Sequence, residues 1–145
     1  MRIVALDYGE KRIGVAVAQT EVGVALPMAV LPNEMDTVLR FLKDQKPDRI
    51  VVGVPYRLSG EAGRRAQQVQ AFIDALRAQL DIPIDTVDER FSSREAESRL
   101  LQAGYRRRER RAVQDSVAAA LLLETYLHQT YLRRYPQPDI LEPDL

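Results

Sequence analysis

The chain has 145 residues, no cysteine and a formal net charge of zero. This length suits one ordinary domain, which can bury roughly two-thirds of its unfolded surface without a disulfide or a structural metal. The absence of cysteine excludes disulfides and thiolate sites, so mainly carboxylate oxygens would hold any metal ion, and these suit magnesium or manganese. We expect neither a signal peptide nor a membrane helix, because no segment approaches the ~20 apolar residues that a membrane helix needs. The balanced charge argues against a protein coated in positive charge for binding nucleic acid.

The first part of the chain predicts three strands. Residues 2–7 and 12–19 have the composition of buried strands, and the turn-forming residues between them predict an antiparallel hairpin. Residues 22–31 are rich in branched apolar side chains. Because proline cannot donate a hydrogen bond to a ladder, Pro27 favours an edge or irregular third strand there.

Helices and strands then alternate. Residues 34–45 carry apolar side chains at three- and four-residue spacing, which predicts an amphipathic helix. Residues 49–54 are continuously apolar, as in a strand that is covered on both faces. A second long helix begins near Glu61, and its apolar stripe continues to Leu80. Residues 84–88 form a short fifth strand.

Two more helices complete the predicted order. Ser92 or Ser93 can cap the first of them and Gly104 can close it. The second spans about residues 112–129. The whole order predicts an α/β domain with a mixed five-stranded sheet, three antiparallel strands first, flanked by helices.

The end of the chain differs in composition from the rest. Residues 135–145 contain three prolines and several acidic residues, which predicts an extended or disordered tail. We therefore expect one domain over residues 1–134 and no second domain.

Three carboxylates occupy positions where a charge is costly. Asp7 ends an apolar strand, Glu89 follows the fifth strand, and Asp115 lies near the start of the last helix on its apolar face. Carboxylates from three elements could converge at one edge of the sheet and hold hard cations. Two such cations could stabilise the attacking and the leaving oxygen of a phosphodiester.

Each carboxylate also has a structural explanation. Asp7 could hydrogen-bond the amides of the turn that follows it. Glu89 could pair with a neighbouring arginine at the surface. Asp115 could stabilise the dipole of its helix. Taken one at a time, the three residues are weak signals of a metal site.

The segments around these carboxylates resemble four motifs of a known family. The motifs correspond to Ala5–Ala16, to Val51–Pro55 with Gly60, Gly63, Arg65 and Ala66, to Asp88–Ser93 with Glu95 and Ala96, and to Asp115–Ser116. In this order they resemble the YqgF/RuvX family, described as pre-16S ribosomal RNA nucleases or Holliday junction resolvases. The resemblance extends from Met1 to about Leu132.

The resemblance implies a ribonuclease-H-like fold, a cytoplasmic bacterial setting and cleavage that depends on Mg²⁺ or Mn²⁺. It carries the family's catalytic and metal-binding acids over onto Asp7, Glu89 and Asp115. This chain departs from the family pattern at Glu10 and in the loop after Pro55, where substrate contacts could differ. Related resolvases often use a fourth carboxylate, and Glu10 and Asp88 are the two candidates here.

Basic side chains near these motifs are candidates for binding nucleic-acid phosphates, since arginine's forked donors suit phosphate oxygens. The alternative is a solvated basic surface. The candidates are Lys11, Arg12, Arg64, Arg65, Arg106, Arg107, Arg108, Arg110 and Arg111.

The sequence leaves several functions open. We expect a nuclease that processes the 5′ end of pre-16S ribosomal RNA, as a monomer or a homodimer. The main alternative is a Holliday junction resolvase, which needs two active sites and hence a dimer to cut branched DNA symmetrically. An actin-like ATPase would need a second domain. A non-catalytic nucleic-acid-binding module remains as a third class.

Overall fold

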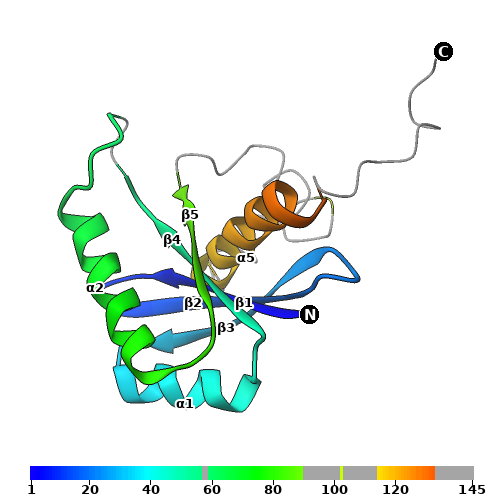
Figure 1. The fold of residues 1–145 in the computed structure, drawn as a ribbon, viewed down its shortest axis with the longest axis horizontal. Helices are drawn as coiled ribbons and strands as arrows, with labels where there is room; N and C mark the ends of the chain where they lie inside the picture. Colours follow the sequence, from blue (N-terminus) through cyan, green and yellow to red (C-terminus); the bar gives the residue numbers. More distant parts are fainter. Residues whose placement is uncertain (57–58, 90–101, 103–113, 133–145) are drawn as a thin grey trace.

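The computed structural model describes residues 1–56, 59–89, 102 and 114–132, which fold around one sheet (Figure 1). The strands are β1 (Arg2–Tyr8), β2 (Arg12–Gln19), β3 (Val24–Pro32), β4 (Arg49–Val54) and β5 (Ile84–Asp88). Their order is β3-β2-β1-β4-β5. The first three strands are antiparallel, and β4 and β5 run parallel to β1. The predicted mixed sheet with three antiparallel strands first is confirmed.

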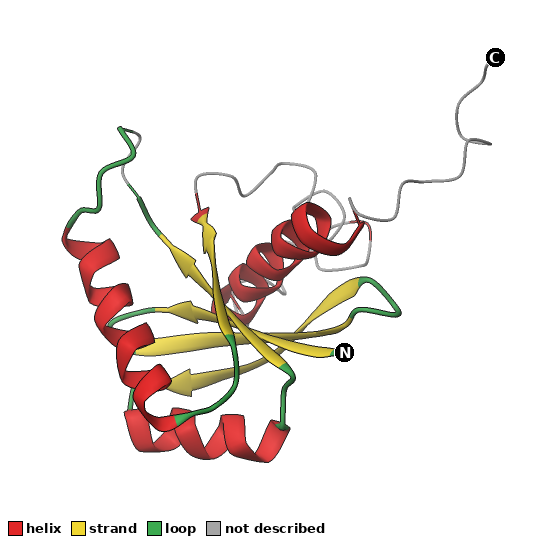
Figure 2. Ribbon diagram, viewed as in Figure 1, coloured by secondary structure: helices red, strands yellow, loops and turns green. Residues whose placement is uncertain are grey.

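Helices cover both faces of this sheet. Helices α1 (Met35–Gln45) and α2 (Arg64–Gln79) lie on one face, and α5 (Gln114–Leu127) lies on the other (Figure 2). Because successive side chains of a strand point to opposite faces, β1 contributes Val4 and Leu6 to the core under α1 and α2, and Ile3 and Ala5 to the core under α5. This double cover explains the continuous apolar run of β4. No described helix is long and apolar enough to cross a membrane.

Strand β3 forms one edge of the sheet, as Pro27 predicts. Its pairing with β2 shifts register between Val15 and Ala16. The irregularity lies beside Pro27, which pairs with Ala16 and brings no N–H group to the ladder.

Polar contacts fasten α5 to the sheet. Tyr126 donates a hydrogen bond of 2.5 Å to Asp85 in β5, and the same carboxylate oxygen accepts one of 2.9 Å from Arg49 in β4. Nearer the middle of α5, Glu124 accepts a hydrogen bond of 3.1 Å from the backbone N–H of Ala25 in β3. The helix is therefore tied to both edges of the sheet.

Two predicted helix boundaries are wrong. Helix α2 begins at Arg64 rather than near Glu61, because Gly63 has the extended backbone of an N-cap, with φ −78° and ψ −174°. The last helix does not end near residue 129, since it continues as the π-helix η2 (His128–Leu132). The helix expected between Ser92 and Gly104 lies outside the described residues apart from Gln102, which is helical. The predicted tail, residues 135–145, also lies outside them.

The N-terminal turn of α5 rests directly on β2 at Gly14. A Cβ atom built on Gly14 would lie 1.8 Å from the carbonyl oxygen of Asp115 and 2.9 Å from the backbone nitrogen of Ser116. Backbone atoms cannot yield as a flexible side-chain end can. Only glycine therefore allows this approach between the strand and the helix.

We expect the substitution Gly14→Ala to displace the start of α5 and to lower the free energy of unfolding by about 3 kcal/mol, the upper end for overpacking. Urea unfolding followed by circular dichroism measures the change. The matched control is Gly63→Ala. Alanine adopts the backbone conformation of Gly63 freely, so this change should lower the free energy of unfolding by less than about 1 kcal/mol. Equal losses in the two variants would contradict the close approach at Gly14.

Candidate functional site

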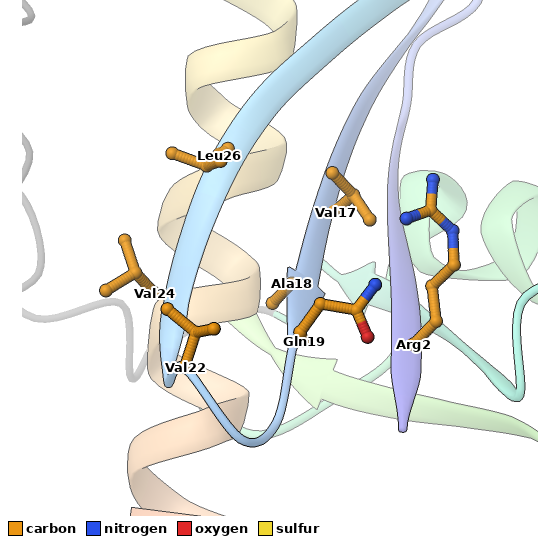
Figure 3. Close-up of a pocket in the computed structure, with 7 residues that line it drawn as sticks. All are labelled: Arg2, Val17, Ala18, Gln19, Val22, Val24 and Leu26. Atoms are coloured by element: carbon orange, nitrogen blue, oxygen red, sulfur yellow. The ribbon is translucent and has the colours of Figure 1, made fainter.

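The two ends of the sheet differ sharply in chemistry. At the end where β1 begins, a hollow of about 370 Å³ is lined mainly by apolar side chains and carries no carboxylate (Figure 3). Its lining residues are Arg2, Val17, Ala18, Gln19, Val22, Val24 and Leu26. Such walls offer no ligand for a hard cation. The hollow is therefore not where a metal-assisted nuclease would do its chemistry.

The opposite end of the sheet collects the three predicted carboxylates. Asp7 lies near the end of β1, Glu89 directly follows β5, and Asp115 is in the first turn of α5. Since β1, β4 and β5 run parallel, their carboxyl ends meet at the same edge. Asp7 also pairs with Gly14 across the hairpin, and Gly14 is where the backbone of Asp115 rests.

All three carboxylates belong to the face of the sheet that α5 covers. Asp7 follows Ile3 and Ala5 at alternate positions, and those two side chains pack under α5. Glu89 folds back over β4, because its Oε1 atom lies 2.9 Å from the position of a Cβ atom on Gly53. The Leu122 side chain of α5 lies equally close to that position, at 2.7 Å. Gly53 thus makes room for a carboxylate and a helix at one place.

The negative charges around Asp7 act against its ionisation. The pKa of Asp7 is raised from 3.8 to about 7, first by burial and then by the negative charges of Glu89 and Asp115. Burial also raises the pKa of Glu89, and Asp88 adds to that rise. A bound cation would favour the ionised forms of Asp7 and Glu89 and so offset this rise in their pKa values.

Arg65 is the positive group that acts on two of the acids. It lowers the pKa of both Asp7 and Glu89, against the larger effect of burial. Its guanidinium donates a 3.1 Å hydrogen bond to the carbonyl of Tyr8 and lies 6.0 Å from the centre of the Tyr8 ring. The first turn of α2 therefore holds an exposed arginine beside the end of β1.

Arg12 contacts the third acid. Its Nε atom donates a 3.0 Å hydrogen bond to Oδ2 of Asp115. Lys11 and Arg64 are exposed near the same edge, as a phosphate contact requires. The five arginines predicted from residue 106 to residue 111 lie outside the described residues.

The carboxylates have the right chemistry for a hard cation but do not yet form a closed coordination shell. In the described part of the chain, no three acidic or histidine side chains already stand as a group that could hold one metal ion. Oxygen donors from Asp7, Glu89 and Asp115 would hold it, and Asp115 is engaged by Arg12 instead. Of the two candidates for a fourth ligand, Asp88 is half-buried beside Glu89, whereas Glu10 is exposed in the turn after β1.

Reasoning from the sequence missed two supporting residues. Gly53 belongs to the second motif and marked the end of a strand, but the sequence did not show that its missing side chain admits Glu89. Asn33 donates hydrogen bonds of 2.8 and 3.3 Å to the carbonyls of Gly9 and Glu10, and so braces the turn that leads into Arg12. A lone asparagine between a strand and a helix is a common turn residue and does not reveal such a contact.

The raised pKa of Asp7 predicts a loss of stability as the pH rises from about 4 to about 7. In this window the folded protein binds the Asp7 proton more tightly than the unfolded chain does, so deprotonation favours unfolding. Asp7→Asn stays neutral. At about 1.4 kcal/mol per pKa unit, reduced because the carboxyl is only half-buried, we expect this variant to be about 1–3 kcal/mol more stable than the natural protein at pH 8.

Urea unfolding at pH 4 and pH 8 without divalent cations tests this expectation. The gain should shrink at pH 4, where the natural carboxyl is protonated in the folded state. Asp36→Asn, an exposed acid in the first turn of α1, should show no such pH-dependent gain. An equal gain for Asp7→Asn at both pH values would contradict the raised pKa.

Comparison with known proteins identifies the family of this chain. A family model described as "RuvX: Holliday junction resolvase" matches residues 1–129. A protein of Natranaerobius thermophilus named "Putative pre-16S rRNA nuclease" is 39% identical over 132 residues, which are 88% of this chain and 94% of that protein. A protein of Halothermothrix orenii with the same name is 40% identical over 133 residues, covering 88% and 95% of the two chains.

Solved structures share the fold at low sequence identity. Thermus thermophilus RuvC, in complex with a Holliday junction substrate, matches with a TM-score of 0.60 at 15% identity, over 90% of this chain and 97% of that one. The fowlpox virus resolvase, in complex with Holliday junction DNA, matches with a TM-score of 0.57 at 15% identity, over 90% and 99%. These likenesses confirm the ribonuclease-H-like fold. Together with the family model and the relatives, they show that the chain belongs to the RuvX family of nucleases.

Proposed function

We propose that this nuclease uses divalent metal ions held by Asp7, Glu89 and Asp115 to cut the phosphodiesters of a ribosomal RNA precursor. One observation carries the proposal: three acids from β1, the end of β5 and α5 converge on one face, where Gly14 and Gly53 clear space for them. Two acids that both raise the pKa of Asp7, contributed by separate elements, favour a functional role for this group over a purely structural one.

The carboxylate ligands indicate which kind of metal ion the site would bind. Carboxylate oxygens suit Mg²⁺ or Mn²⁺. When bound, such ions supply charge that stabilises the attacking and the leaving oxygen of the phosphodiester. Asp7, Glu89 and Asp115 would hold the ions on the face of the sheet that α5 covers.

The basic side chains around the edge bind the nucleic-acid backbone. Arg65 is held by Tyr8 beside Asp7, and Lys11, Arg12 and Arg64 are exposed nearby. We assign the same role to the arginines from residue 106 to residue 111. These contacts recognise phosphate and carry no sequence information.

The names of the relatives favour RNA as the substrate. Both are named "Putative pre-16S rRNA nuclease", which supports RNA as the substrate and a cytoplasmic setting for the activity. Branched DNA is the second candidate, because the family model is described as a Holliday junction resolvase and RuvC with its junction shares the fold. Symmetric cutting of a junction would need two active sites and hence a homodimer, whereas RNA trimming can proceed on a monomer.

We expect Asp7→Asn to reduce cleavage roughly 100-fold or more, since asparagine keeps the shape but removes the charge that a cation needs. Labelled precursor rRNA, single-stranded RNA and a four-way DNA junction are incubated with the protein and Mg²⁺, Mn²⁺ or EDTA. Asp36→Asn serves as the control and should cut at the natural rate. Because Asp7→Asn is expected to be the more stable protein, a loss of cleavage would not reflect unfolding.

The other outcomes of this assay distinguish between the alternative functions. Equal cleavage by the natural protein and Asp7→Asn would show that the edge of the sheet that carries Asp7, Glu89 and Asp115 is not the active site. Binding without cleavage by either protein would favour a non-catalytic binding module. A strong preference for the junction, cut by a dimer, would replace the RNA assignment with the resolvase.

Arg65→Ala should weaken binding of every nucleic acid to a similar degree and reduce the salt dependence of binding by about one phosphate contact. Fluorescence anisotropy in EDTA, at several salt concentrations, measures binding apart from cleavage. Arg40→Ala, which removes an exposed arginine from α1, is the matched control. If both substitutions had the same small effect, Arg65 would be no phosphate contact.

A further inference from the structure

Arg12 and Asp115 form an ion pair across the candidate site. The residues are 103 positions apart in the sequence, and Nε of Arg12 lies 3.0 Å from Oδ2 of Asp115. In the part of the chain that the structure describes, no other ion pair involves one of the three carboxylates. Asp115, the acid that α5 contributes, is therefore already paired with a side chain of β2.

This contact uses only part of each group. The Nε atom of Arg12 makes the bond, and among the described residues the two terminal amino groups of its guanidinium contact no other side chain. The side chain of Arg12 is 68% exposed and that of Asp115 is 31% exposed. An ion pair as exposed as this one is weak and exchanges readily.

The backbones on both sides are fixed. Asp115 cannot shift with its helix, because its carbonyl already rests on Gly14. Arg12 is held in β2, where it pairs with Pro32 of β3. Any change at this contact is therefore an exchange of side-chain partners, and the long exposed arginine is the group that can move.

A cation bound at the edge of the sheet that carries Asp7, Glu89 and Asp115 would compete with Arg12 for the Asp115 carboxylate. A carboxylate oxygen that accepts a guanidinium hydrogen bond offers less electron density to a metal ion, and the two positive charges repel each other. The described acids do not stand ready as a three-ligand group, which agrees with one of them being engaged elsewhere. Arginine keeps its charge at every accessible pH, so it leaves Asp115 only by exchange.

We propose that Arg12 is a positioning residue that holds the Asp115 carboxylate until a divalent cation displaces it, and that the released guanidinium then binds the substrate phosphate beside that cation. This inference rests on the proposed metal-dependent function. It gives Arg12 a different role from Lys11, which is exposed one residue earlier and has no ion pair among the described residues. Metal loading and phosphate binding become coupled through one side chain.

The test compares Arg12→Gln with Lys11→Gln in the full chain. Both remove one positive charge next to the site, but only the first removes the contact with Asp115. Calorimetric titration with Mn²⁺ alone should show about two- to fivefold tighter binding by Arg12→Gln than by Lys11→Gln, as expected for an exposed ion pair. At saturating Mn²⁺, Arg12→Gln should instead raise KM for the nucleic acid, because the phosphate contact is lost.

A spectroscopic readout follows the exchange in the natural protein. The ¹⁵N resonance of the Arg12 Nε–H group should shift and broaden when Mg²⁺ is added, and Arg12→Gln identifies that signal by its absence. Equal Mn²⁺ affinities in the two variants, or weaker binding by Arg12→Gln, would overturn the proposal. If the natural protein binds Mg²⁺ and the Arg12 signal does not change, this inference alone fails. If neither the natural protein nor the variants bind a divalent ion, the proposed metal site fails with it.

Discussion

The contact between the first turn of α5 and Gly14 of β2 is the constraint on which the rest of the site depends. Gly14 pairs with Asp7 in the neighbouring strand, so the helix that rests on Gly14 necessarily brings Asp115 beside Asp7. A side chain at position 14 would force the two apart. The proximity of Asp7 and Asp115 thus depends on the missing Cβ atom of Gly14, which is far in sequence from α5, and the missing Cβ atom of Gly53 makes room for Glu89.

Gathering acids on a covered face works against stability. Burial and mutual repulsion raise the pKa of Asp7 to about 7, and Arg65 offsets only part of this effect. Destabilising arrangements are commonly retained where function needs them, which agrees with the proposed metal site. The arginines at Arg12 and Arg65 act as counterions within the chain, one by direct contact and one from a distance.

Exposed apolar side chains line the β3 edge of the sheet. In the described residues, the exposed large apolar side chains all lie on the β2–β3 turn and β3, on Val22, Val24, Leu26, Met28 and Val30. The hollow beside this turn faces the end where β1 begins, whereas the carboxylates lie where β1 ends. Along β3 the apolar row extends to Val30, which pairs with Gly14, the partner of Asp7 in β1.

The sequence by itself predicted the five strands and the order of the described elements, and it singled out Asp7, Glu89 and Asp115 as candidate site residues. Strand and helix periods are local properties, and the motifs around Asp7, Glu89 and Asp115 are contiguous. The start of α2 could not be predicted, because the extended backbone at Gly63 outweighs the apolar stripe that suggested an earlier start. Only the tertiary structure decided that Gly53 admits Glu89, that Arg65 is held by Tyr8 and that Arg12 engages Asp115. These contacts join residues far apart in the chain, and packing of helix against sheet, rather than any local pattern, sets the distances between them.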